Sequence, residues 1–443
     1  MTRAPVVGPV SRKQSAGYTT EVRIAPHLLD WCDDAQVSRA RSQAAITIGR
    51  LAGWASRITG RGAGTQVSGR IMLAIDPGLL TKLGSQDRVI CVSATNGKTT
   101  TTRLIADILR AAEIDVVTNH TGANMASGVT GALAAPHAAS VAVLEVDERW
   151  LTHVVDPLSP ELLVFGNLSR DQLDRSGEVN AIVKRWRAIT EADPMRHVIA
   201  NSSDPHVVFA ALPARVTWVA LGIPWIQDAT TCPQCSELLT WSDDGFKCSA
   251  CGFAEPDADY RLEGEYFVAG ERRIHLDLSI PGAWNLMNAA LAATVAEAHF
   301  EIPAEDAIKA MSSVEVVSGR FSKHRLDDGR EARVILAKNP AGWTEVLNWL
   351  KGRDAGVVLA VNAHIADGRD TSWLYDVNFE ALQGLSVVAS GERALDVAVR
   401  LRYAGVECIV EPDPLKAALA AGGKEVDIIA SYTQFTHLTK RFW

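Results

Sequence analysis

The run Ser93-Ala94-Thr95-Asn96-Gly97-Lys98-Thr99-Thr100 carries residue types that bind the phosphates of a nucleotide. It follows a short apolar segment, Val89–Ser93, and precedes a helical pattern over Thr99–Ala112. Backbone N–H groups at a helix N-terminus bind phosphate, and Gly97 lets the backbone approach it closely. Lys98 would contact the β- and γ-phosphates, and the Thr99 hydroxyl would bind Mg²⁺. The predicted ligands of ATP-Mg²⁺ are Thr95, Asn96, Gly97, Lys98, Thr99 and Thr100.

This loop departs from the general Walker pattern, which places a glycine where this chain has Val92. A shorter form, Thr95-Asn96-Gly97-Lys98-Thr99-Thr100, fits instead. A chance loop that binds nothing is the alternative, and the strand–loop–helix context argues against it.

Four cysteines form a second pattern with chemical meaning. Cys232 and Cys235 are followed by Cys248 and Cys251, which gives C-x₂-C-x₁₂-C-x₂-C. Four thiolates at this spacing suit one tetrahedral Zn²⁺ and leave no open position, so we predict a structural site. Iron is the alternative ion, and disulfides are the alternative without a metal. The flanking segments are too short to bury a core, so the metal would hold this insert together.

The length, net charge and cysteine content of the chain restrict the classes of protein to which it can belong. The chain has 443 residues, more than the ~100–200 of one domain, and a net charge of −8 that disfavours a nucleic-acid binder. Met1–Tyr18 has no apolar segment of the kind that secretory signals carry. Seven cysteines, four of them in a metal-type pattern, fit a reducing compartment better than a disulfide framework. We therefore expect a cytoplasmic protein.

Short apolar segments alternate with helical ones along most of the chain. This alternation predicts an α/β protein, with mostly parallel sheets covered by helices on both faces. The strands predicted for the first unit are Val89–Ser93, Val116–Thr118, Val141–Val146, Leu162–Phe165, His197–Ala200 and Val216–Leu221. Those predicted for the second unit are Arg333–Leu336, Val357–Val361, Ser386–Ala389, Glu407–Val410 and Asp427–Ala430.

The predicted organisation has three parts. Residues 1–36 show no periodicity and are expected to be a flexible lead-in. Residues 37–316 would form the ATP-binding domain, interrupted by the cysteine-rich insert at about 223–258, and 317–443 a C-terminal α/β domain. From Val37 to about Gly60 the pattern is helical.

On that helix one side carries Arg39, Arg50, Arg57 and Arg61, and the opposite side carries Ala44, Ile48, Leu51, Ala55 and Ile58. We expect the apolar side to pack on the domain and the arginines to face solvent. Contact of the arginines with an anionic membrane surface or substrate is the alternative.

The short phosphate loop resembles that of the Mur ligase family, which joins acids to amines through acyl phosphates. Further segments agree in order and spacing from about residue 40 to the C-terminus. Leu144–Glu148 resembles the segment whose glutamate, here Glu145, holds Mg²⁺. Asn167–Asp174 resembles N-I-S-x-D-H-L-D. Gly282–Ala290 resembles G-x-H-N-x-x-N-A-x-A, whose first asparagine, here Asn285, contacts the nucleotide. Gly319-Arg320-Phe321 resembles the segment whose arginine contacts ATP at the domain junction.

Each of these residues also has a plain structural interpretation. Glu145 could be a surface carboxylate at a strand end, Asn285 a helix cap and Arg320 a member of an interface salt bridge. Departures from the family pattern restrict the resemblance to part of the family. The family's histidine is Gln172, and the segment before the phosphate loop is too short for a separate sugar-nucleotide domain. Lys184 lies near a position that some members carbamoylate, although the spacing does not match.

The C-terminal segments Ala337–Gly342, Asp367–Trp373 and Ala389–Ala394 resemble one branch of the family, the ATP-dependent subunits of an enzyme that amidates lipid II. The resemblance implies a Mur ligase-like central domain with a zinc-ribbon insertion, and a Rossmann-like C-terminal domain. It implies that ATP activates the α-carboxylate of D-Glu in the lipid II stem peptide. Ammonia from a glutaminase partner, in a heterodimer, would then give D-isoglutamine at the inner face of the cell membrane.

The resemblance also implies that an aspartate of the C-terminal domain completes the partner's Cys–His pair, as in any triad. Asp367 is the first choice and Asp370 the second; alternatively, both are turn residues beside Gly368. In this interpretation Lys98, Glu145, Asp367 and Asp370 would be the catalytic residues. Rival functions are a Mur-type or folylpolyglutamate-type ligase that adds an amino acid, and a regulatory nucleotide switch without chemistry.

Overall fold

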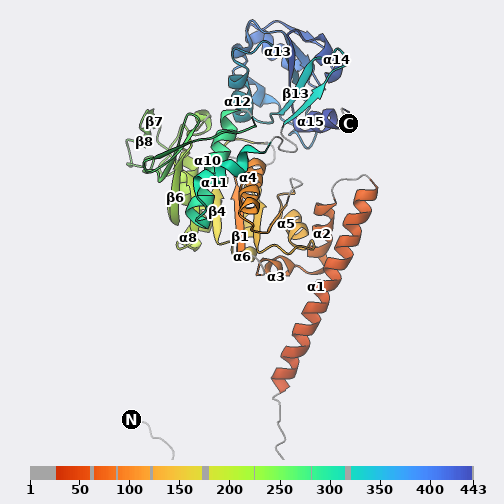
Figure 1. Ribbon diagram of the computed structural model, residues 1–443, viewed down its shortest axis with the longest axis vertical. Helices are drawn as coiled ribbons and strands as arrows, with labels where there is room; N and C mark the ends of the chain where they lie inside the picture. The colour runs from red at the N-terminus through yellow and green to blue at the C-terminus, as the bar shows by residue number, and fades with distance from the viewer. Residues whose placement is uncertain are drawn as a thin grey trace, which may run out of the picture.

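The computed structural model describes residues 26–59, 64–85, 88–119, 123–171, 179–223, 225–280, 282–314 and 321–441. Two α/β units, each built on its own sheet, are stacked one above the other (Figure 1). The prediction of an α/β fold with mostly parallel sheets is confirmed.

The first sheet has nine strands in the order β11-β10-β9-β6-β5-β4-β1-β3-β2. Its strands from β1 to β6 and the β6–β9 pair are parallel, whereas β9, β10 and β11 are antiparallel, an extension that the sequence analysis did not predict. The strands are β1 Arg88–Ser93, β2 Val116–Thr118, β3 Val141–Glu145, β4 Leu162–Phe165, β5 His197–Asn201, β6 Arg215–Ala220, β9 Tyr260–Glu263, β10 Tyr266–Ala269 and β11 Arg272–His275.

Helices cover both faces of this sheet because alternate strand residues point to opposite sides. In β1, Ile90 and Val92 belong to the core under α4, α10 and α11, while Val89 and Cys91 belong to the core on the other face. The first group comprises α4 Lys98–Ala111, α10 Ala283–Phe300 and α11 Ala304–Ser312. The second comprises α3 Leu79–Gly84, α5 Ala126–Leu133, α6 Leu151–Leu158, α8 Val179–Ala192 and α9 Pro205–Ala211.

The second sheet has six strands in the order β12-β13-β17-β14-β15-β16, all parallel except β12. Separate cores lie on its two faces. Its strands are β12 Phe321–Arg325, β13 Glu331–Leu336, β14 Ala355–Ala360, β15 Val387–Ser390, β16 Cys408–Val410 and β17 Glu425–Ala430. Its helices are α12 Pro340–Leu350, α13 Ala394–Tyr403, α14 Pro414–Ala420 and α15 Tyr432–Arg441, with 3₁₀ turns η2 Ser372–Tyr375 and η3 Phe379–Leu382.

The cysteine-rich insert lies between β6 and β9, preceded by the 3₁₀ turn η1, Ile226–Asp228. It contains a hairpin of β7, Leu239–Ser242, and β8, Gly245–Cys248, with a small core of its own. Phe246 and Phe253 form that core together with two of the cysteines, and Val208 of α9 joins it to the main domain.

The first helix differs from its prediction in both extent and orientation. Helix α1 spans Pro26–Ile58, so it begins ahead of the expected start at Val37. Its N-terminal part extends away from the rest of the molecule (Figure 1). The side expected to be buried is exposed: Ile48 is 49%, Leu51 61% and Ile58 66% accessible. The expected lead-in over residues 1–25 lies outside the described residues.

Small residues explain why α1 packs through a different side from the predicted one. Helix α1 packs on α2, Thr65–Ile75, through Ala45, Gly49 and Gly53. A Cβ on Gly49 would lie 2.4 Å from Met72 Cγ, so only glycine permits this approach. Close backbone contact compensates for the ~1 kcal/mol that glycine costs in a helix interior. The predicted side was chosen by its large apolar residues, which here do not make the contact.

Candidate functional site

Two sheet edges that carry polar loops face each other where the two units meet. The carboxyl ends of β1, β3 and β4 lead into Ala94–Gly97, Val146–Glu148 and Asn167–Asp171. In the second unit, the carboxyl end of β13 leads into Lys338 and Asn339. Carboxyl edges of parallel sheets are where open α/β folds bind their ligands. The functional residues are therefore expected between the two units.

The phosphate loop joins β1 to α4 as predicted. Gly97 has φ +85°, a backbone conformation that other residues rarely adopt, and a Cβ there would lie 2.1 Å from Asn288 Oδ1. Thr101 donates a hydrogen bond to the same Asn288 oxygen at 3.3 Å. Asn288 of α10 therefore closes over the loop, and the loop requires glycine for two independent reasons.

Lys98 lies buried among carboxylates. Its Nζ donates to Glu148 Oε2 at 2.9 Å, to the carbonyl of Thr95 at 3.2 Å, and to the carbonyl of Ala94. Burial alone would lower the pKa of Lys98, but Glu148, Glu145 and Asp147 together raise it above its ordinary value. The lysine is thus a fixed cation at the start of α4.

Thr99 and Glu145 meet beside the phosphate loop. Thr99 Oγ1 donates to Glu145 Oε2 at 2.8 Å, and Asn124 Nδ2 donates to Glu145 Oε1 at 3.1 Å. Asn119 fixes the backbone of Glu145 from both sides, with bonds of 2.8 and 2.7 Å. A hydroxyl and a carboxylate are the hard oxygen donors that Mg²⁺ prefers, so this pair fits the ion.

The segment after β4 holds the phosphate loop in shape. Asn167 Oδ1 accepts from the Asn96 backbone N–H, and Asn167 Nδ2 donates to the Asn96 carbonyl, both at 3.0 Å. Thr95 N–H donates to the Asn167 carbonyl at 2.8 Å, and Ser169 N–H donates to Thr95 Oγ1 at 3.0 Å. Because these bonds are all made within the protein, they fix the shape of the loop independently of a phosphate ligand.

The second unit contacts this loop directly. Asn96 Nδ2 donates to Asn339 Oδ1 at 3.3 Å, and Asn339 Nδ2 donates to Asn96 Oδ1 at 3.1 Å. Beside this pair Lys338 forms an ion pair with Asp171. Arg170 of the first unit forms another ion pair with the second unit, in which its Nη1 lies 3.1 Å from Asp376 Oδ2. The contacts bring the C-terminal unit onto the nucleotide site.

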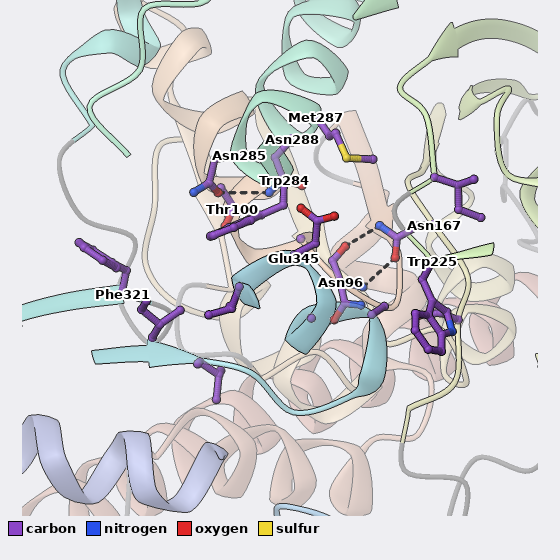
Figure 2. A pocket seen from close by; sticks show the side chains of 18 of the residues that line it. Asn96, Thr100, Asn167, Trp225, Trp284, Asn285, Met287, Asn288, Phe321 and Glu345 are labelled. Atoms are coloured by element: carbon purple, nitrogen blue, oxygen red, sulfur yellow. Dashed lines mark hydrogen bonds between the residues drawn. The ribbon is translucent and has the colours of Figure 1, made fainter. Parts of the chain in front are cut away.

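A cavity opens beside the phosphate loop between the two units (Figure 2). Its walls carry two indole rings, Trp225 and Trp284, together with Asn285. Glu345 of α12 lies between Trp284 and Asn96 in Figure 2, and burial raises its pKa to about 6. Apolar walls, two flat aromatic rings and a few polar groups suit the nucleoside part of a nucleotide. Asn285 lines this cavity beside the phosphate loop.

Some predicted residues fall outside the described residues, namely Arg320, Gln172 and the end of the Asn167–Asp174 segment. Lys184 is exposed on α8 and does not line the cavity. The sequence analysis missed Asn339, Glu345, Trp225 and Trp284 as site residues. A sequence signal for Glu345 existed, because it is the one charged residue of α12 and lies between Trp343 and Val346.

The two aspartates of the Asp367–Trp373 segment have different surroundings. Asp367 is buried: it accepts from the Thr433 N–H at 2.8 Å, the Thr433 hydroxyl at 2.6 Å and the His364 N–H at 3.2 Å. Asp370 is exposed and accepts from the Ser372 N–H at 2.8 Å. This bond holds the pKa of Asp370 below its ordinary value. Both aspartates line one pocket, and Asp370 is the more exposed of the two carboxylates.

The four cysteines of the insert converge. Their sulfur atoms all lie within 4.8 Å of one another. The Cys232–Cys251 sulfur distance is 3.7 Å and the Cys235–Cys248 distance is 3.5 Å. Those separations are far beyond the ~2.05 Å of a disulfide. They are close to the ~3.8 Å edge of a tetrahedron with ~2.3 Å metal–sulfur bonds. The cluster can hold a metal ion.

Comparisons with known proteins agree with this geometry. The family model described as "Mur ligase middle domain" matches residues 92–223, and that described as "MurT ligase C-terminal" matches residues 336–435. Among solved structures, a pseudomurein peptide ligase type C from Methanothermus fervidus matches with a TM-score of 0.64 at 18% identity, covering 81% of this chain and 79% of that one. MurF from Acinetobacter baumannii matches with a TM-score of 0.62 at 15% identity, covering 84% and 80%. These two structures establish the fold.

Relatives with closer sequences establish the family. The lipid II isoglutaminyl synthase (glutamine-hydrolyzing) subunit MurT of Staphylococcus aureus (strain COL) is 33% identical over 416 residues, covering 85% of this chain and 92% of the relative. The subunit of the same name from Streptococcus pneumoniae (strain ATCC BAA-255 / R6) is 31% identical over 429 residues, covering 87% and 94%. With both its central and its C-terminal segments matched, the chain belongs to the MurT family of Mur ligase-like proteins.

Proposed function

We propose that this chain is the ATP-dependent subunit of a lipid II isoglutaminyl synthase. In this reaction the α-carboxylate of D-Glu in the lipid II stem peptide becomes an amide, giving D-isoglutamine. The observation that carries the proposal is the contact of Asn339 with the phosphate loop at Asn96, which joins a Mur-type ATP site to the C-terminal domain of this family. The names of the relatives supply the substrate.

A carboxylate must be activated before ammonia can replace its oxygen, because oxide is a poor leaving group and phosphate is a good one. A carboxylate oxygen of D-Glu attacks the γ-phosphorus of ATP, ADP leaves, and an acyl phosphate forms. Ammonia then attacks the acyl carbon, phosphate leaves with the C–O bond electrons, and the nitrogen loses a proton to give the amide. The net consumption is one ATP and one ammonia for each amide formed.

The residues of this chain would neutralise and position the reacting anions. Lys98 would contact the β- and γ-phosphates, and the backbone of Gly97 would approach them. Thr99 and Glu145 would hold Mg²⁺, which supplies further positive charge when bound. Arg320 would add a cation at the domain junction. Asn285 and the indoles of Trp225 and Trp284 would contact the nucleoside.

Exclusion of water is the second requirement, because an acyl phosphate hydrolyses. The Asn96–Asn339 and Asp171–Lys338 contacts keep the C-terminal domain over the phosphate loop. We infer that these contacts shield the intermediate until ammonia arrives. A hinge between the units near Gly319-Arg320 would let substrates enter.

Ammonia would come from a separate glutaminase subunit of the GatD type, which forms a heterodimer with this chain. Its Cys–His pair would take its orienting aspartate from here. Asp367 is committed to Thr433 and His364, whereas Asp370 is exposed and ionised. These surroundings favour Asp370, the second choice of the sequence analysis, over Asp367.

The cysteine cluster would hold a structural Zn²⁺. Sulfur ligands at all four positions leave no site for substrate, and the hairpin around them has only a small core. Zinc would therefore stabilise the insert, which contacts α9 of the ATP-binding domain through Val208.

The site of action follows from the substrate. Lipid II carries its peptide at a membrane surface, so we propose that the protein is cytoplasmic and acts at the inner face of the cell membrane, with peripheral contact. Among the described residues, no helix combines the length and apolar character needed to cross a bilayer.

One reconstitution distinguishes this function from its rivals. The chain is mixed with its glutaminase partner, ATP-Mg²⁺, glutamine and lipid II, and the stem peptide is analysed by mass spectrometry. A product one mass unit lighter, in which –NH₂ replaces –OH, supports amidation. Addition of a whole amino acid would identify an amino-acid ligase, and ATP binding without any peptide product would identify a switch.

A further inference from the structure

A second large cavity lies apart from the nucleotide site, between α1, α2, α5 and the edge strand β2. It is an open groove of ≈ 770 Å³. The residues used below are Arg50, Leu51, Trp54, Arg57, Asn119 and His137, all of which line it. Among the described residues, none of those assigned to ATP, Mg²⁺, zinc or the glutaminase lines this groove.

The groove is cationic although the chain carries a net charge of −8. Arg50 and Arg57 supply the positive charge, His137 lines the groove beside them with its Nε2 3.2 Å from the Leu133 carbonyl, and none of the described residues in the lining is acidic. Arg50 is held in place, because its Nε, at 3.0 Å, and its Nη2 both donate to the Ala134 carbonyl, so its donors toward a ligand are the remaining N–H groups of Nη1 and Nη2. Arg57 is exposed. Arginine binds the oxygens of phosphate groups with paired N–H donors, so the groove suits a phosphate-bearing ligand.

An apolar surface continues from the groove along the outer side of α1. Leu51 and Trp54 line the groove and are 61% and 58% exposed. Ile48 and Ile58 extend this surface on the same helix and are 49% and 66% exposed. Arginines beside exposed tryptophan and aliphatic residues are typical of surfaces that meet both a charged head group and a hydrocarbon chain.

The groove is connected to the reacting centre through Asn119. Asn119 lines the groove, and its side chain bonds to both the N–H and the carbonyl of Glu145. Glu145 in turn accepts from Thr99 at the phosphate loop. Asn119 therefore places the groove one hydrogen-bonded residue away from Glu145.

We propose that this groove binds the pyrophosphate that links a prenyl chain to the sugar-peptide substrate. Arg50, Arg57 and His137 bind the pyrophosphate, the prenyl chain leaves along the outer side of α1, and the peptide extends toward Thr99 and Glu145. This inference rests on the proposed function and adds the site that holds the lipid end of the substrate.

Arg57→Ala tests the proposal, because Arg57 is exposed and its truncation leaves the α1–α2 contact intact. Amidation is measured in the complete complex, with ammonium chloride as the nitrogen source and two substrates. One is lipid II in uncharged detergent micelles, and the other is the muramoyl peptide without pyrophosphate or lipid. The variant should raise KM for lipid II about tenfold, the effect of one charge-assisted hydrogen bond. KM for the muramoyl peptide and both kcat values should stay unchanged.

Arg185→Ala is the matched control, because Arg185 is an exposed arginine on α8 outside the groove. It should change neither KM. If Arg57→Ala leaves KM for lipid II unchanged, or raises KM for both substrates equally, the groove does not bind the pyrophosphate. If the wild-type complex amidates neither substrate, the proposed function itself fails.

Competition identifies the chemical group that the groove recognises. With ATP saturating, farnesyl pyrophosphate should compete with lipid II in the wild type and compete about tenfold less well in Arg57→Ala. Farnesol should compete far less well than farnesyl pyrophosphate. Equal competition by farnesol, or an Arg57 effect seen only in anionic vesicles and absent in uncharged micelles, would overturn the proposal in favour of general membrane attraction.

Discussion

Asn96 of the phosphate loop and Asn339 at the start of α12 form a reciprocal amide pair, with each side chain donating to the other. Asn339 also caps α12, since its Oδ1 accepts from the Gly342 N–H at 2.9 Å. A single side chain therefore starts a helix of the C-terminal domain and contacts the predicted phosphate loop. The position of one domain is linked to the shape of the other domain's active site.

Replacing Asn339 with serine should separate these two roles. Serine still caps a helix, so the free energy of unfolding should change by less than ~1 kcal/mol. Its side chain is too short to reach Asn96, so kcat for amidation should fall while ATP still binds. Asn339→Ala should show the same loss of kcat plus the capping cost of ~1 kcal/mol. Urea unfolding and steady-state amidation measure the two effects, and a Ser variant with normal kcat would contradict the link.

Lys98→Met should abolish ATP turnover and also destabilise the domain. The lysine is buried against Glu148, so its removal leaves a buried carboxylate without its cation, at a cost of ~3–5 kcal/mol. Turnover should fall by roughly 10²–10³-fold or more, because the phosphates lose their fixed charge. The double variant Lys98→Met/Glu148→Gln should recover much of the stability and none of the turnover. Bound zinc should be unchanged in both.

Local sequence signals predicted the strands and the phosphate loop well. Strands such as Val141–Glu145 are runs of apolar residues, and the glycine before Lys98 marks the loop. The Asn96–Asn339 pair could not be predicted, because its members are 243 positions apart and the motif around each residue gives no sign of the other. The packing side of α1 was mispredicted. A periodicity analysis gives most weight to large apolar residues, whereas α1 contacts α2 through Gly49 and Gly53, whose small size lets the two helices approach closely.

The stability of the protein should fall between pH 4.5 and pH 6 because of Glu345. Burial raises its pKa from 4.5 to about 6, so the folded state binds this proton more tightly than the unfolded state. The stabilisation is present below pH 4.5 and is lost as pH rises through about 6. The loss amounts to at most ~2 kcal/mol. Urea unfolding at several pH values should show this fall reduced in Glu345→Gln and unchanged in the exposed control Glu407→Gln.

Metal analysis should find zinc in the protein when it is purified without chelators. Cys235→Ser should lose stoichiometric zinc and make the insert sensitive to proteolysis, because the hairpin around Phe246 depends on the metal. Cys408→Ser is the control, since Cys408 lies on β16 of the other domain and should leave the metal content unchanged. Protein that contains no metal and resists proteolysis equally in all three forms would refute the zinc site.

Asp370→Asn should abolish glutamine hydrolysis in the complex while leaving amidation from ammonium chloride intact. Loss of the charge that orients a triad histidine lowers kcat by about 10⁴-fold, and Asp370 does not line the nucleotide cavity. Asp367→Asn should behave differently, because Asp367 accepts from Thr433 and His364 inside the domain. It should lower stability by ~1–3 kcal/mol and reduce both activities together. Size-exclusion chromatography checks that each variant still binds the glutaminase. Selective loss of glutamine hydrolysis in Asp367→Asn, with normal stability and with Asp370→Asn active, would assign the triad to Asp367 instead.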